Sequence, residues 1–160
     1  MRSTLDLPRV MSPRVHRMLA NPRFKAELDR SYTVNRDYDI PFVAGYSTDE
    51  RTIYIDRHYK KMMGKFDTEP TIILHEKVEK SLIDCFGLRY QSAHHIATHV
   101  ERDAIRAMGI DWTEYENFVE RQYKIIGHEQ VRKVPRKLDL TPYRDDSSIE
   151  MVRAMTAAMD

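Results

Sequence analysis

Residues 71–80, TIILHEKVEK, open a predicted amphipathic helix whose apolar face also carries three ionisable side chains. At about 100° per residue, the apolar residues of this helix fall in one sector: Ile72, Leu82, Ile83 and Phe86. His75, Glu76 and Glu79 fall in the same sector. An ionised carboxylate that is buried without a partner is very costly. The pattern therefore predicts a shared partner for the three groups, such as a cation held between this helix and a neighbouring one.

The spacing of these groups is typical of a metal site. His75 and Glu79 are four residues apart, so their side chains lie on adjacent turns and can point at one atom. Glu76 leans beside that atom. Zinc binds imidazole nitrogen and carboxylate oxygen, and open zinc sites use three protein ligands plus a water molecule. A third ligand is therefore expected from a neighbouring element.

The next predicted helix is rich in histidine. The stretch SAHHIATHVERD, residues 92–103, contains His94, His95 and His99. His95 and His99 are again four residues apart. Asp103 follows His99 by one turn, from where its carboxylate could hydrogen-bond a ligating imidazole. Of His94 and His95, one can point to solvent while the other binds substrate or replaces His99 as a ligand.

The two predicted helices resemble those of the zincin metallopeptidases, in particular the thermolysin-like branch. The motif H-E-x-x-E at 75–79 is a variant of H-E-x-x-H. The following helix carries His99 and Asp103 at nearly the spacing of the family. The ligand types are exchanged, because Glu79 stands where the family has histidine and His99 stands where it has glutamate. The resemblance covers about residues 50–108.

The resemblance implies a metal-dependent peptidase. Its Zn²⁺ would be held by His75, Glu79 and His99, and Asp103 would brace a ligating histidine through a hydrogen bond. Glu76 would act as the general base, and the substrate would be a peptide or a protein. A carboxylate in place of the second imidazole should raise the pKa of the bound water. We therefore expect modest activity, or a metal that is harder than zinc.

The resemblance also calls for a hydrogen-bond donor that stabilises the negative charge developing on the attacked carbonyl. The sequence leaves four candidates for this donor: His95, Tyr90, Tyr115 and His128.

The other segments predict an α+β fold. Residues 41–46 and 51–56 are rich in β-branched and aromatic residues and are separated by a turn-like linker, which is typical of a β-hairpin. In the zincin resemblance, residues 51–56 look like the edge strand that pairs with substrate over the cleft. Capping residues, prolines and glycines place the helices, at 12–30 with a break at Pro22, 70–86, 92–108, 111–126 and, after a capping box at Ser147 and Glu150, 149–158.

These elements predict a small antiparallel hairpin packed on a helical half, as in zincins, with the two site helices in that half. Residues 1–146 would form one domain, in which residues 127–146 are extended and wrap the body. Residues 147–160 would form a C-terminal helix or arm. An arm of this kind offers a route to a homo-oligomer, because it can lie on its own body or on that of a neighbour.

The composition excludes several classes of protein. The 26 basic and 25 acidic residues give a net charge of +1, which is no general field for nucleic acid or an anionic membrane. No stretch approaches 18 apolar residues, so no membrane span is expected. Residues 1–10 contain no apolar region of a secretory signal. The single cysteine, Cys85, excludes an internal disulfide and suits a reducing compartment. These features predict a cytoplasmic protein.

Two other functions fit the same residues. In the first, the ligands hold a structural metal or none, and an exposed strand binds a partner peptide; a structural zinc site is closed by four protein ligands. His95 and His99 together would close the site in this way. In the second, the chain is an adaptor or assembly protein that uses residues 132–146, RKVPRKLDLTPYRDD, as a docking arm.

Overall fold

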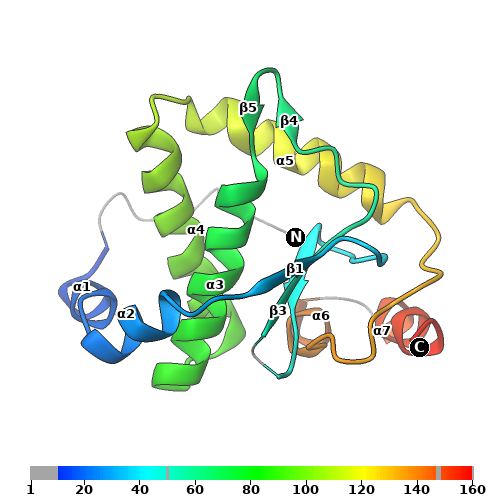
Figure 1. Cartoon of the computed structure of the whole chain (residues 1–160), viewed down its shortest axis with the longest axis horizontal. Helices are drawn as coiled ribbons and strands as arrows, with labels where there is room; N and C mark the ends of the chain where they lie inside the picture. Colours follow the sequence, from blue (N-terminus) through cyan, green and yellow to red (C-terminus); the bar gives the residue numbers. More distant parts are fainter. Residues whose placement is uncertain (1–10, 50, 147–148, 160) are drawn as a thin grey trace.

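The protein has an α+β fold in which a small sheet lies between helices and the C-terminal part of the chain (Figure 1). A computed structural model describes residues 11–49, 51–146 and 149–159. The helices are α1 (Pro13–Leu19), α2 (Pro22–Leu28), α3 (Glu69–Phe86), α4 (Tyr90–Ala107), α5 (Trp112–Gly127), α6 (Thr141–Asp146) and α7 (Ile149–Ala157). The strands are β1 (Thr33–Asn35), β2 (Ala44–Tyr46), β3 (Thr52–Ile55), β4 (Met62–Met63) and β5 (Phe66–Asp67).

The main sheet has three strands in the order β1-β3-β2. The predicted β-hairpin is confirmed, because β2 and β3 pair antiparallel with Gly45 opposite Tyr54. The expectation that residues 51–56 form an edge strand is wrong. β1, which the sequence pattern did not reveal, pairs parallel with the other side of β3 and makes it the central strand. Within the described sheet, β2 is therefore the edge strand on the hairpin side.

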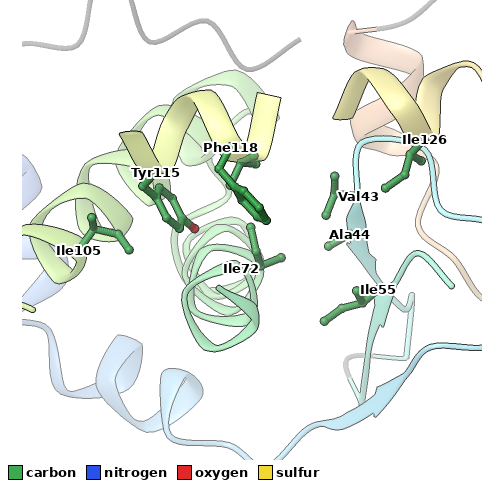
Figure 2. Close-up of a cluster of buried hydrophobic side chains, with 9 residues drawn as sticks. Val43, Ala44, Ile55, Ile72, Ile105, Tyr115, Phe118 and Ile126 are labelled. Carbon is green, nitrogen blue, oxygen red and sulfur yellow. The ribbon is translucent and has the colours of Figure 1, made fainter. Parts of the chain in front are cut away.

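Both faces of β3 are buried. Ile55 belongs to a cluster that includes Ile72 of α3 and Tyr115 and Phe118 of α5 (Figure 2). Tyr54 points to the opposite face. There it packs with residues of the C-terminal part of the chain: Val134, Leu138, Leu140, Tyr143 and Met155. The sheet therefore packs on the long helices with one face and on the C-terminal segment with the other, and β2, which pairs with β3, lies between these two layers.

Helices α3 and α4 form an antiparallel pair joined by residues 87–89. α3 has Pro70 in its first turn and ends at Gly87, whose left-handed backbone (φ 63°) is a conformation that glycine adopts without strain. In the pair, His75 lies opposite Glu101 and Glu79 lies opposite His94. This alignment brings the ionisable face of α3 against one face of α4.

The other helices begin and end close to the predicted residues. Pro22 divides the first helical segment into α1 and α2, which have Ser12 and Asn21 as N-caps. Asp111 caps α5 by accepting a hydrogen bond from the Glu114 N–H at 2.9 Å. The capping residue predicted at Ser147 and the reading of residues 1–10 as free of a secretory signal concern residues outside the described ranges.

The segment after α5 lies on the body of its own chain. Backbone hydrogen bonds join it to the sheet side of the molecule, from Asp39 N to Lys133 O at 2.8 Å and from Asp139 N to Tyr46 O at 2.9 Å. The prediction that it is extended through residue 146 is wrong for its last part, because Thr141–Asp146 forms α6. Pro142 lies in the first turn of α6, where its missing N–H costs nothing. α6 thereby carries Tyr143 into the interior.

A buried carboxylate, Asp39, anchors this segment. Its Oδ2 accepts hydrogen bonds from the backbone N–H groups of Arg132 and Lys133 at 2.8 and 2.9 Å, and Arg57 pairs with Oδ1 at 2.7 Å. Burial alone would raise the pKa of Asp39, but these hydrogen bonds and the Arg57 charge outweigh it and lower the pKa below 3.8. The folded state therefore favours the ionised form of Asp39.

Replacing this carboxylate is expected to weaken the fold in a pH-dependent way. For Asp39→Asn we expect a loss of about 1.5–3 kcal/mol in the free energy of unfolding near neutral pH, the range for hydrogen bonds to charged groups. Because the folded pKa is lowered, the stabilisation is complete above pH 5 and disappears as the pH falls below 3.8. Urea unfolding of both proteins between pH 7 and pH 2 measures this difference. A difference that stays constant over this range would contradict the account.

Candidate metal centre

Three donor atoms from α3 and α4 converge at one point. His75 Nε2 lies 3.2 Å from Glu79 Oε2 and 3.1 Å from His94 Nδ1, and the third side of the triangle, from His94 Nδ1 to Glu79 Oε2, is 3.0 Å. His75 and Glu79 are almost fully buried, and the His94 side chain is 23% exposed. Among the described residues, this is the one group of three that could hold a metal ion. We call it the tripod.

The other ends of the tripod residues are fixed by hydrogen bonds. His75 Nδ1 lies 2.9 Å from Glu101 Oε1, and Tyr115 donates its hydroxyl proton to the other oxygen of Glu101. Tyr46 of β2 donates to Glu79 Oε1 at 3.0 Å. Partners of this kind set the ring orientation of a ligating histidine and the direction of a carboxylate. As a result, His75 Nε2 and Glu79 Oε2 are left facing the same point.

Hydrogen bonds alone cannot satisfy all three contacts within the tripod. Burial would raise the pKa of Glu79, but the contacts with His75 and His94 outweigh it and lower the pKa, so Glu79 is ionised and only accepts hydrogen bonds. Each histidine nitrogen would have to donate to Glu79. The two nitrogens would then face each other at 3.1 Å with a proton on both. A cation among three lone pairs satisfies all three contacts at once.

The size of the tripod fits a zinc-like ion. Zinc binds these ligands at about 2.0–2.2 Å in a tetrahedral arrangement, which separates neighbouring ligand atoms by about 3.3–3.6 Å. The three sides of the tripod measure 3.0, 3.1 and 3.2 Å. A small outward shift of the three side chains would therefore form one face of such a tetrahedron, and the fourth corner would be open.

A small cavity of about 30 Å³ lies against the tripod. Its lining comprises the tripod residues, Glu76, and residues of β2, α4, α5 and α6 with their flanks: Phe42, Ala44, Gly45, Tyr90, Tyr123, Pro142 and Tyr143. A space of this size holds about one water molecule. Of the residues that the structure describes, Glu76, which is 6% exposed, is thus the one carboxylate outside the tripod in this lining.

Tyr143 brings an unused hydrogen-bond donor to this cavity. The residue is 1% exposed, and within the described part of the chain its hydroxyl has no hydrogen-bond partner. The hydroxyl lies beside Gly45, where an added Cβ atom would come within 3.0 Å of it. Burial, together with the Glu76 carboxylate, raises the pKa of Tyr143 well above its ordinary value. The hydroxyl therefore keeps its proton and can donate it in a hydrogen bond to an oxygen atom that enters the cavity.

An aromatic residue with a strained backbone lines the same cavity. Phe42 stacks on Tyr123 and on Tyr143, with ring centroids 5.2 and 5.0 Å away. Phe42 and Val43 both have positive φ angles, 67° and 75°. Such angles cost about 1–3 kcal/mol each in residues other than glycine, and Val43 is β-branched, for which they are rare. The packing of the Phe42 ring against Tyr123 and Tyr143 therefore stabilises a backbone conformation that these residues do not favour on their own.

The structure brings together some of the predicted site residues and separates others. His75, Glu76 and Glu79 share the site, and His94 joins them in place of His99. His99 is buried on another face of α4, where its Nδ1 lies 2.7 Å from Arg102 Nη2. Burial, and next the charge of Arg102, lower the pKa of His99. Asp103 is exposed, and the carboxylate that contacts Nδ1 of His75 is that of Glu101.

The four predicted candidates for the hydrogen-bond donor to the attacked carbonyl also lie in different places. Tyr90 lines the cavity, whereas Tyr115 donates to Glu101 behind the tripod, and neither His95 nor His128 is part of the lining. The sequence did not indicate Tyr143, because its position depends on α6. The position of Glu101 could have been predicted from the sequence, because it lies seven residues after His94 and hence on the same face of α4.

Comparison of the chain with protein-family models, with curated proteins and with solved structures finds no match. Among the described residues, no helix has the length and the apolar character needed to cross a membrane.

Proposed function

We propose that this protein is a metal-dependent hydrolase, most simply a zinc peptidase that acts on a peptide or protein in the cytoplasm. The observation that carries the proposal is the convergence of His75 Nε2, Glu79 Oε2 and His94 Nδ1 beside a cavity that Glu76 also lines. His75, Glu79 and His94 would hold the ion. When bound, a zinc ion supplies Lewis acidity and lowers the pKa of water toward neutrality.

The side chains around the cavity have different roles in this reaction. Glu76 accepts the proton of the attacking water and passes it to the leaving amine. The Tyr143 hydroxyl donates a hydrogen bond to the carbonyl oxygen as negative charge develops on it. Glu101 keeps the proton of His75 on Nδ1, so that Nε2 presents a lone pair.

The number of ligands favours catalysis over a structural metal. A structural zinc site is closed by four protein ligands, whereas a catalytic site keeps one position for water or substrate. Three donors meet in the described part of the site, and His99 is held elsewhere by Arg102. A zinc ion held by these three residues would therefore remain able to bind water or a substrate atom from the cavity that Glu76 and Tyr143 line.

Hydrolysis of a fluorescently labelled protein such as casein tests the proposal. Zn²⁺-loaded protein should cleave it, 1,10-phenanthroline should stop the reaction, and renewed Zn²⁺ should restore it. Cleavage that survives the chelator would contradict a metal-dependent reaction. Zinc binding without cleavage of any peptide or protein in a broad panel would instead support the non-catalytic binding domain.

Removing the Phe42 ring should make the metal more accessible from solvent. Each stacked aromatic pair contributes about 0.5–1.5 kcal/mol beyond its burial, so Phe42→Ala is expected to speed removal of the metal by EDTA roughly tenfold or more. Tyr38→Ala is the matched control, because it removes an aromatic pair with Tyr54 that does not line the cavity. Equal rates of metal removal from Phe42→Ala and the wild type would show that Phe42 does not control access.

A further inference from the structure

We infer that Tyr46 determines which metal the centre prefers: it holds one oxygen of Glu79, leaves the other for the ion, and so favours zinc over ions that take more oxygen ligands, such as Mn²⁺. This inference rests on the proposed function, because it concerns the ion that the tripod would hold. Tyr46 contacts Glu79 and is not one of the three donors, so it is a positioning residue.

The two oxygens of the Glu79 carboxylate have different partners. Oε2 lies 3.2 Å from His75 Nε2 and 3.0 Å from His94 Nδ1. Oε1 accepts a hydrogen bond from the Tyr46 hydroxyl at 3.0 Å, and both residues are almost fully buried. To bind an ion with both oxygens, the carboxylate would have to turn Oε1 away from Tyr46. A buried hydroxyl that loses its acceptor costs about 1–3 kcal/mol, so the hydrogen bond favours binding through Oε2 alone.

The packing around Tyr46 keeps its hydroxyl from following the carboxylate. Its backbone is held on both sides of β2, by pairing with Ile53 of β3 and by the 2.9 Å hydrogen bond from Asp139 N to Tyr46 O. The Lys80 ammonium lies 5.5 Å from the centre of the Tyr46 ring, where the π electrons attract a cation. The hydroxyl therefore has a fixed position, and this position sets the direction of the Glu79 carboxylate.

The number of oxygen ligands distinguishes zinc from manganese. Zinc is satisfied by four ligands in a tetrahedral arrangement, three of them from the protein in an open site. The tripod supplies three when Glu79 binds through one oxygen. Manganese prefers an octahedral set of carboxylate and water oxygens, so it gains more from a second carboxylate oxygen. Phenylalanine at position 46 would release Oε1 of Glu79 and thereby favour manganese relative to zinc.

The test compares wild type, Tyr46→Phe and Tyr54→Phe. Each substitution removes one hydroxyl and keeps the ring. Tyr54 is the matched control, because it is buried on the adjacent strand and packs on the opposite face of the sheet. Affinities for Zn²⁺ and Mn²⁺ are measured by competition with chelators of known affinity and compared as a ratio, since a general loss of stability weakens both alike. The visible absorption of bound Co²⁺, which is intense with four ligands and weak with five or six, is the second readout.

In Tyr46→Phe, the affinity for Mn²⁺ relative to Zn²⁺ should rise by about tenfold or more, because replacing a partner of a metal ligand changes metal affinity by about 10–100-fold. The Co²⁺ absorption should weaken in the same variant, and Tyr54→Phe should match wild type in both readouts. An unchanged ratio and spectrum in Tyr46→Phe, or the same changes in Tyr54→Phe, would overturn this inference and leave the metal centre standing. A wild type that binds none of the three ions would overturn the proposed function as well.

Discussion

Glu76→Gln is expected to lower the hydrolytic rate of the Zn²⁺-loaded protein by about 10²–10⁴-fold, the usual contribution of a general base. Glutamine has nearly the same shape as glutamate, so it should fill the same buried position, but its amide does not accept the proton of water. Because Glu76 is not part of the tripod, the zinc content should stay close to that of wild type. The measurement is kcat for a cleaved peptide together with metal content.

Retained zinc is what separates this result from a loss of the site. Glu120→Gln, which changes the charge by the same amount on α5, should keep full activity. A Glu76→Gln protein that keeps its zinc and its rate would exclude Glu76 as the base.

Glu101→Gln is expected to weaken zinc binding by about 10–100-fold, as replacement of partners of ligating histidines does. A carboxylate at position 101 accepts the Nδ1 proton of His75 and so leaves a lone pair on Nε2. Glutamine can instead present an N–H to Nδ1, which moves the histidine proton to Nε2, the atom that faces the tripod. Competition with a zinc chelator of known affinity measures the change.

Asp103→Asn is the control for this prediction. Asp103 lies on the same helix and is the residue that the zincin resemblance assigns to bracing, but in the structure it is exposed. Zinc affinity should therefore be unchanged in Asp103→Asn. A larger loss there than in Glu101→Gln would restore the assignment made from the resemblance.

The parts of the fold that could be predicted have local causes. Pro22 divides the first helical segment, Gly87 ends α3 and Asp111 caps α5, because each residue acts on the backbone within a few positions of itself. The β2–β3 hairpin also has a local signal, two β-rich runs around a turn. β1 did not, since a three-residue strand is recognised only by its pairing with β3.

The third member of the tripod depended on how two helices pack. At about 100° per residue, His99 lies roughly 140° around α4 from His94, whereas Glu101 lies within about 20° of it. Either face of α4 could have met α3 as far as the sequence pattern showed. The family spacing favoured the face of His99 and Asp103, and the packing in the structure selects that of His94 and Glu101.

Tyr143 was beyond prediction for a different reason. It reaches the cavity because α6 follows an extended segment that hydrogen-bonds to β2, through Asp139 and Tyr46. This contact joins residues more than ninety positions apart, and no local pattern reports it. Tyr46 is similar, because its hydrogen bond to Glu79 depends on β2 lying beside α3.

Without a metal, the same buried groups have one other explanation. A proton on His75 Nε2 would make an imidazolium between the carboxylates of Glu79 and Glu101, which is a buried ion triad with a structural role. Wherever the His94 proton lies, this arrangement still leaves one of the three tripod contacts without a hydrogen bond. Metal content distinguishes the two explanations directly.

The most direct test is therefore the zinc content of purified wild type and of alanine variants at His75, Glu79, His94 and His99, measured by mass spectrometry after dialysis against trace zinc. We predict about one equivalent of zinc in wild type and in His99→Ala, because three ligands suffice for an open site. The same reasoning predicts loss of the zinc in the other three variants. Zinc that persists in His94→Ala and disappears in His99→Ala, or a wild type that binds none, would contradict the tripod.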